Sequence, residues 1–161
     1  GTIIKPGMSI MVDACGNFTG YMTDMSRSYK VGEVGELAER AHRCSVEICH
    51  KIAQTARPGV AAKDLVALAE ATVAEAGLAD YFMGHKQKAG FIGHGVGIEI
   101  NELPVLSARS KDVLVEGNVI ALEPKFVIPG VGAVGIENTY AITATGTECL
   151  TNMPEELQQL M

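Results

Sequence analysis

Basic side chains are scarce in this sequence, and they do not cluster. The 161 residues include 13 Lys and Arg against 19 Asp and Glu, which gives a formal net charge of -6. Proteins that bind nucleic acids or anionic membranes neutralise phosphates with groups of Lys and Arg. The composition therefore argues against both as the main partner of this chain.

Long apolar runs are missing as well. No stretch reaches about 18 consecutive apolar residues, the length that a membrane-spanning helix needs. The first residues also lack a charged region followed by an apolar signal core. The sequence predicts no membrane segment, and we expect a soluble protein of the cytoplasm.

Disulfide and zinc-finger spacings are absent. The chain has four cysteines and none of them forms a Cys-x-x-Cys pair. This pattern predicts small buried thiols in a reducing compartment rather than disulfides or a structural zinc site. The cysteines are Cys15, Cys44, Cys49 and Cys149.

Signatures of a nucleophilic serine or a phosphate loop are not found either. Ser9, Ser26 and Ser28 lack the sequence context of a catalytic nucleophile, and no glycine loop of the phosphate-binding type is present. These serines therefore receive no predicted role.

Two amphipathic helices are predicted in the first half of the chain. Residues 35–57 carry an apolar stripe at steps of three and four, and residues 62–76 carry a second one that ends at Gly77. His42 and His50 are eight positions apart, share no helical face and lack a metal-ligand spacing, so we expect both at the surface. The first stripe is formed by Leu37, Ala41, Cys44, Ile48 and Ile52.

Residues 11–29 read as a β-hairpin with one aspartate on each strand. Turn-forming Gly and Asn flank a reversal near Phe18 and Thr19. A turn there places Asp13 opposite Asp24, with Cβ atoms about 5 Å apart, where two like charges destabilise a sheet. The arrangement predicts that something offsets the repulsion.

A second hairpin is predicted over residues 118–143. Glu123 and Glu137 lie on either side of Gly130, so they face each other unless a bulge shifts the register. A single acidic residue in a strand is most often only solvent-facing. Two opposed pairs on apolar strands are harder to explain in that way, because four carboxylates raise one another's pKa unless cations are present. The pattern favours a dinuclear metal site.

His94 lies between two glycines in the segment 91–106. The residues Val96, Ile98 and Ile100 then alternate toward a predicted strand. A lone histidine beside apolar residues is more often a satisfied core group than a ligand. The four unpaired carboxylates favour the ligand reading here. By contrast, His85 has polar neighbours, and we expect it on a loop.

The predicted ligand set is rich in oxygen, with one nitrogen and no sulfur. Such a set suits Mn²⁺, Fe²⁺, Co²⁺ or Zn²⁺. Paired ions of this kind share a water molecule, lower its pKa and polarise a carbonyl or phosphoryl oxygen, so hydrolysis is the expected reaction class. The set consists of Asp13, Asp24, His94, Glu123 and Glu137.

The order of these motifs resembles a known family. Two aspartates eleven positions apart, GHG, ALEP and GIENT are similar to the metallopeptidases of the pita-bread fold, which include methionine aminopeptidases, Xaa-Pro aminopeptidases and prolidases. The hairpin VDACGNFTGYMTDMSRSY resembles the Xaa-Pro branch. The resemblance implies an α+β fold: the second half of a pita-bread (creatinase/aminopeptidase) fold, with a curved antiparallel sheet backed by two helices.

The resemblance also implies roles for the ligands. Asp13 would chelate one metal ion, Asp24 and Glu137 would bridge both, and His94 and Glu123 would hold the other. Glu123 and His94 are the expected catalytic residues, with Glu123 moving the proton from water to the leaving nitrogen. Two divalent ions are expected, with Mn²⁺ favoured and Co²⁺, Fe²⁺ or Zn²⁺ as alternatives.

Three departures from the family pattern concern substrate binding. Asn101 stands where the family has a substrate-contacting histidine, and Gly135 stands where the Xaa-Pro branch often has arginine. Both positions are predicted substrate contacts. The first half of the fold would precede Gly1, so we expect residues 1–161 to be one truncated catalytic domain. An exposed sheet edge would favour a homodimer.

Two classes of function follow from these observations. The first is a dinuclear-metal hydrolase that cleaves Xaa-Pro peptide bonds, like a prolidase or an Xaa-Pro aminopeptidase, acting on peptides with proline at the second position. The second is an inactive binding module of the same fold, since fold alone does not decide function. A methionine aminopeptidase-like enzyme is a third alternative.

Overall fold

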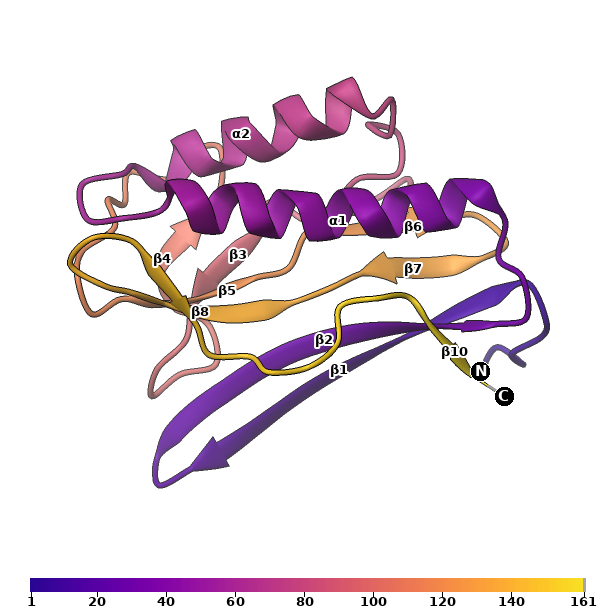
Figure 1. The fold of residues 1–161 in the computed structure, drawn as a ribbon, viewed down its shortest axis with the longest axis horizontal. Coiled ribbons are helices and arrows are strands. Elements are labelled where there is room, and N and C mark those ends of the chain that lie inside the picture. Colours follow the sequence, from indigo (N-terminus) through magenta and orange to yellow (C-terminus); the bar gives the residue numbers. More distant parts are fainter. Residues whose placement is uncertain (161) are drawn as a thin grey trace.

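The computed structural model describes residues 1–160, which form two helices and ten strands in an α+β arrangement. Both helices lie side by side on one face of the strands (Figure 1). The helices are α1 (Glu36–Thr55) and α2 (Ala62–Glu75). The strands are β1 (Met8–Phe18), β2 (Tyr21–Val31), β3 (Gly93–Gly95), β4 (Glu102–Leu106), β5 (Val119–Leu122), β6 (Lys125–Ile128), β7 (Gly132–Gly135), β8 (Asn138–Ile142), β9 (Thr147–Cys149) and β10 (Gln158–Leu160).

The predicted helices are confirmed to within two residues at each end. The stripe of α1 is buried against the strands and α2, which removes its apolar side chains from water. Helix α2 ends before Gly77, whose φ of +67° closes the last turn, and Leu78 N donates to Val73 O. No helix of residues 1–160 is long and apolar enough to cross a membrane.

The strands form a mostly antiparallel surface in three hydrogen-bonded groups. The orders are β4-β3-β5-β8-β9, β6-β7 and β1-β2-β10. The expected antiparallel arrangement is confirmed, and at one edge β10 adds to β2 as a parallel strand. The C-terminal segment, residues 150–160, crosses from β9 to the hairpin before it pairs, and that crossover makes a parallel partner possible.

The first hairpin has the predicted strands but a turn one residue later than expected. Thr19 and Gly20 form a two-residue turn with φ values of +54° and +90°, and this turn type suits the twist of a hairpin. Moving a turn by one residue shifts each cross-strand partner by two. Asp13 therefore pairs with Ser26, and the predicted direct opposition to Asp24 is wrong. The two aspartates remain diagonal neighbours on one face.

The second hairpin has the predicted register. Leu122 pairs with Asn138 on one side of the glutamates, and Lys125 pairs with Gly135 on the other, so Glu123 and Glu137 face each other. Neither glutamate takes part in the ladder between them. Glu123 N donates to Ile92 O, and Glu137 N donates to Ser26 O. The ladder thus opens where the two carboxylates lie.

The strand predicted after His94 does not form. β3 ends at Gly95, and Ile98 is 76% exposed on an irregular loop. The carboxylate of Glu102 accepts a hydrogen bond from Glu99 N and closes this loop. A loop closed by a side-chain hydrogen bond cannot be predicted from the alternation of apolar residues.

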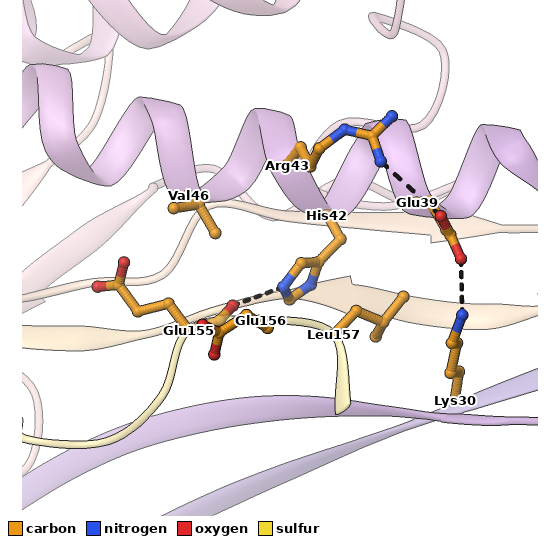
Figure 2. Close-up of a pocket in the computed structure, with 8 residues that line it drawn as sticks. All are labelled: Lys30, Glu39, His42, Arg43, Val46, Glu155, Glu156 and Leu157. Atoms are coloured by element: carbon orange, nitrogen blue, oxygen red, sulfur yellow. Dashed lines mark hydrogen bonds and ion pairs between the residues drawn. The ribbon is translucent and has the colours of Figure 1, made fainter. Parts of the chain in front are cut away.

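The surface position predicted for His42 is wrong, although His50 and His85 are exposed as expected. The C-terminal segment lies over the outer side of α1, where His42 Nε2 bonds to Glu155 O at 2.7 Å (Figure 2). Burial lowers the pKa of His42, so the ring is neutral near pH 7.

The prediction of four buried thiols is right for only half of them. The cysteines of α1 are buried, whereas Cys15 on β1 and Cys149 on β9 are exposed. All four thiols are free, as expected. Both exposed thiols lie on strands with a solvent-facing side, where an apolar neighbour in the sequence does not imply burial.

Candidate metal centre

Three of the five predicted ligands converge on one point. One ligand atom each from Asp24, His94 and Glu137 lies within 4.8 Å of the other two, and all three side chains are buried. They come from β2, β3 and the junction of β7 with β8. Glu123 joins them, because its Oε1 is 3.6 Å from His94 Nε2. The structure thus brings together four predicted ligands from distant parts of the chain.

The orientation of His94 leaves a nitrogen lone pair directed at the acidic groups. Its Nδ1 lies 3.0 Å from Gly95 O, and a carbonyl oxygen can only accept, so Nδ1 carries the proton. Nε2 is then unprotonated in the neutral ring, 3.7 Å from Asp24 Oδ2. Fixing the tautomer through the second ring nitrogen is the usual arrangement of a metal-binding histidine.

Glu137 is the most strongly perturbed carboxyl group of the cluster. Burial raises its pKa to about 8, with the charges of Asp24, Glu123 and Asp13 acting in the same direction. A hydrogen bond from Ser26 Oγ to Glu137 Oε2, 2.7 Å long, acts against the increase. Without a cation, this carboxyl group is thus mostly protonated at neutral pH.

The same environment perturbs the pKa of Asp24. Burial raises its pKa first of all, and the charge of Asp13 adds to the increase, while His94 opposes it. Asp13 itself is exposed on β1 and is not one of the three converging ligands. Its charge nevertheless affects both Asp24 and Glu137, so it lies within electrostatic reach of the cluster.

Lys125 is a component that the sequence did not predict. Its Nζ pairs with Glu123 Oε2, so Glu123 faces His94 with one oxygen and an ammonium group with the other. The two residues are separated only by Pro124, and they lie on the same side of the strand. The sequence signal that could have identified Lys125 is its position two residues after a candidate ligand.

Two further residues that the sequence left without a role support the cluster. Ser26 bonds to Glu137, and Arg27, fully buried, bonds with its guanidinium to Ser26 O, Glu137 O and Asn138 Oδ1. Ser9 and Ser28 likewise bond to backbone carbonyl groups of β7. Their function is structural, which agrees with the absence of a nucleophile context.

The two predicted substrate contacts differ in their surroundings. Asn101 is exposed on the loop before β4. Gly135 is buried, and both its N–H and its C=O are bonded to Ser28 Oγ. A Cβ atom there would lie 2.7 Å from Pro124 O and the φ is +149°, so this backbone has no room for a side chain. Substrate contact by either residue stays a prediction.

The residues fit a divalent metal ion. Buried carboxylates without enough cations, two of them with raised pKa, together with a correctly oriented imidazole nitrogen, are the donor set that such ions neutralise. A satisfied core histidine would not direct its lone pair at carboxylates. The geometry therefore favours the ligand reading of His94.

The comparison with known sequences decides the family. Residues 1–144 match the profile of metallopeptidase family M24. The chain belongs to this family. Among curated relatives, the M24 chain is 36% identical to the Xaa-Pro dipeptidase of Pyrococcus horikoshii over 154 residues. The aligned region covers 96% of this chain and 42% of that protein.

Solved structures agree with this assignment. The X-Pro aminopeptidase from Thermotoga maritima superposes with a TM-score of 0.88 at 26% identity, covering 98% of the M24 chain and 42% of that structure. The prolidase from Pyrococcus horikoshii gives 0.86 at 35% identity, covering 97% and 43%. The fold is therefore of the pita-bread type, and the M24 chain spans about two fifths of the length of these relatives.

Proposed function

We propose that this chain carries the metal site of a peptidase that cleaves Xaa-Pro bonds with two divalent ions. The observation that carries the proposal is the convergence of buried acidic side chains from separate strands on one unprotonated imidazole nitrogen. Membership of family M24 and similarity to a protein named Xaa-Pro dipeptidase support the choice of reaction and substrate.

In the proposed site, Asp24 and Glu137 would be shared by the two ions, Asp13 would hold one of them, and His94 and Glu123 would hold the other. The bound ions would supply an acidified water molecule and polarise the scissile carbonyl group. We propose Mn²⁺ as the ion, since the donor set is mostly oxygen.

Glu123 is the proposed proton carrier. A carboxylate beside the attacking water accepts its proton and then donates it to the leaving imino nitrogen of the Xaa-Pro bond. The opposed position of Glu137 and the orientation of His94 hold Glu123 at the open end of the ladder. His94 would contribute Nε2 as a ligand, with its ring held by the contact of Nδ1 with Gly95 O.

The first test is metal content and cleavage in one preparation. After incubation with Mn²⁺ and removal of excess ion, we expect nearly two Mn²⁺ per chain and hydrolysis of Ala-Pro. Asp24→Asn should lose both ions, because a bridging ligand serves both. Loss of only one ion in that variant would contradict the bridging role. Elemental analysis and proline release measure the two quantities.

Glu123→Gln separates binding from chemistry. The variant should keep a large part of its metal, because the amide oxygen still coordinates, but it should lose turnover by about 10²-fold or more. Glu148→Gln, at an exposed position of β9, is the matched control and should behave like the parent. Full activity of Glu123→Gln would rule out proton transfer by this residue.

The alternatives have their own outcomes in this experiment. Faster release of methionine from Met-Ala than of alanine from Ala-Pro would favour a methionine aminopeptidase-like enzyme. Metal-free protein after the Mn²⁺ incubation would mean either that the site needs the first half of the fold or that the chain is a binding module. The longer relatives have more than twice the length of this chain, so the same assays on a longer form belong beside these.

A further inference from the structure

We propose that Lys125 is a specificity-determining residue, and that its ammonium group binds a carboxylate of the peptide substrate, namely the terminal carboxylate of a dipeptide. This inference rests on the proposed function and adds to it the substrate class. It starts from the pair that Lys125 forms with Glu123.

Lys125 stands where the buried cluster meets solvent. Its side chain is 29% exposed, whereas the side chains of Glu123 and His94 are 11% and 6% exposed. Strand β6 holds the lysine opposite Gly135, which has no side chain to compete for the same space. The ammonium group is therefore more accessible to a ligand than the carboxylate of Glu123 or the imidazole of His94.

No second Lys or Arg among residues 1–160 lies within ion-pair distance of a cluster carboxylate. Arg27 is close in sequence to Asp24, but its guanidinium is buried and already donates to five acceptors, including Pro154 O and Met153 O. Arg27 thus has no free donor to offer, and Lys125 does.

When metal ions occupy the site, charge balance favours pairing of Lys125 with a carboxylate of the ligand. Two divalent ions would balance the charge of the four carboxylates of the proposed ligand set, and Glu123 would then hold metal in place of its contact with Lys125. The ammonium group is left half-buried without an anion, which is unfavourable in a site shielded from water. A ligand carboxylate restores the pair and forms a charge-assisted hydrogen bond.

The covalent structure of an Xaa-Pro dipeptide places its terminal carboxylate close to the scissile bond. In Xaa-Pro, only a few bonds separate the carboxylate carbon from the scissile carbonyl carbon. A cationic side chain that binds this carboxylate therefore has to lie directly beside the metal ligands. Lys125 is two positions from Glu123. In a longer peptide, the same position is a neutral amide, and an acidic side chain farther along is the other possible source of a carboxylate.

The test compares substrates that differ only in this charge. For the Mn²⁺-loaded protein we expect kcat/KM for Ala-Pro to exceed that for Ala-Pro-amide, and Lys125→Met to reduce this preference about tenfold or more. Lys125→Arg should keep it, and Lys111→Met, at an exposed position, should leave it unchanged. Ala-Pro-Asp-amide tells the two sources apart, because it carries only a side-chain carboxylate.

Binding gives a second readout without turnover. By calorimetry, the Mn²⁺-loaded parent should bind proline more tightly than prolinamide, and Lys125→Met should bind both alike. The metal-free parent should show no preference, because Glu123 still occupies the lysine. Thermal unfolding of each variant checks that it is folded.

Three results would overturn the inference. Equal losses of Lys125→Met on Ala-Pro and Ala-Pro-amide would mean that the lysine only positions Glu123. A preference for Ala-Pro-Asp-amide over Ala-Pro would transfer the contact to a side-chain carboxylate. If this chain and the longer form both bind no metal, or bind metal but cleave neither peptide, the proposed function itself is refuted, and metal analysis separates that failure from the other two.

Discussion

At the scale of single residues, the cluster consists of groups whose charges conflict without a cation. Asp24 and Glu137 are buried with raised pKa values, and the one Lys or Arg among residues 1–160 that pairs with a carboxylate of the cluster is Lys125 at its rim. Such groups are seldom left unpaired in a fold that uses them only for structure. The conflict can be measured directly as a dependence of stability on pH.

Glu137→Gln should change how the stability of the metal-free protein depends on pH. The folded-state pKa is about 8 against 4.5 for the ordinary group, so the folded protein keeps a proton that the unfolded chain releases. Stability of the parent therefore falls as pH rises from about 4.5 to 8, and Asp24 acts in the same direction.

The variant has no proton to lose at this position, so it should be more stable than the parent at pH 8 by about 1 kcal/mol or more. Urea unfolding in EDTA at pH 5, 6.5 and 8 measures the difference. Glu148→Gln, on the exposed side of β9, should follow the parent. Parallel curves for parent and Glu137→Gln would disprove the buried conflict.

Prediction from sequence was most accurate where the spacing of residues along the chain determines which side chains face each other. The opposition of Glu123 to Glu137 followed from the position of Gly130, and the steps of α1 followed from its apolar stripe. The pairing of Asp13 failed because one residue of turn position decides it. Ser26 was missed because its bond to Glu137 joins segments 111 residues apart, which no local pattern encodes, whereas Lys125 lies two positions from Glu123 and its local signal was overlooked.

At the scale of elements, the C-terminal segment is what the sequence could not place. Residues 150–160 have no helical or strand periodicity, yet they cover α1 at His42 and reach Arg27 through two carbonyl oxygens. This covering explains why a histidine expected at the surface is buried. It also connects the chain's last segment to the backbone of a candidate ligand, since Arg27 bonds to Glu137 O.

Arg27→Met should uncouple these elements. The substitution keeps most of the side chain's length but leaves several buried acceptors without a donor, which should cost about 3 kcal/mol of unfolding free energy or more. Hydrogen exchange of residues 153–160 should accelerate, and metal affinity should fall because Glu137 loses a support.

Denaturant unfolding, exchange mass spectrometry and metal titration measure the three effects. Arg109→Met is the matched control, since Arg109 is exposed and should tolerate the change within about 0.5 kcal/mol. Unchanged exchange in the C-terminal segment of Arg27→Met would show that Arg27 does not hold it.

At the scale of the whole molecule, three hydrogen-bonded groups of strands meet at the candidate metal cluster. β2, β3 and the β7–β8 junction each contribute a ligand, so the site exists only when the groups are assembled. A cation that binds the folded chain should therefore stabilise all of it, by mass action.

Mn²⁺ at about 100 times its Kd should add about 2.7 kcal/mol of stability and raise the Tm by about 5–10 °C, and EDTA should reverse the shift. Differential scanning calorimetry at pH 7.5 measures this effect. Asp24→Asn should show a much smaller increase. An equal increase in that variant would place the ion elsewhere on the molecule. The same preparations, examined by sedimentation, test the predicted homodimer.

The parallel pairing of β10 brings the end of that strand close to the beginning of β1. Met8 and Leu160 both lie beside Val31, one on each side, which places them about 10 Å apart, two strand spacings (Figure 1). A short peptide linker could therefore join the ends into a ring. Opening that ring at the exposed Thr19–Gly20 turn would give a permuted chain in which β1 and β2 find each other without a covalent hairpin. Metal uptake by that permutant would report whether sheet pairing alone keeps Asp13 and Asp24 on one face.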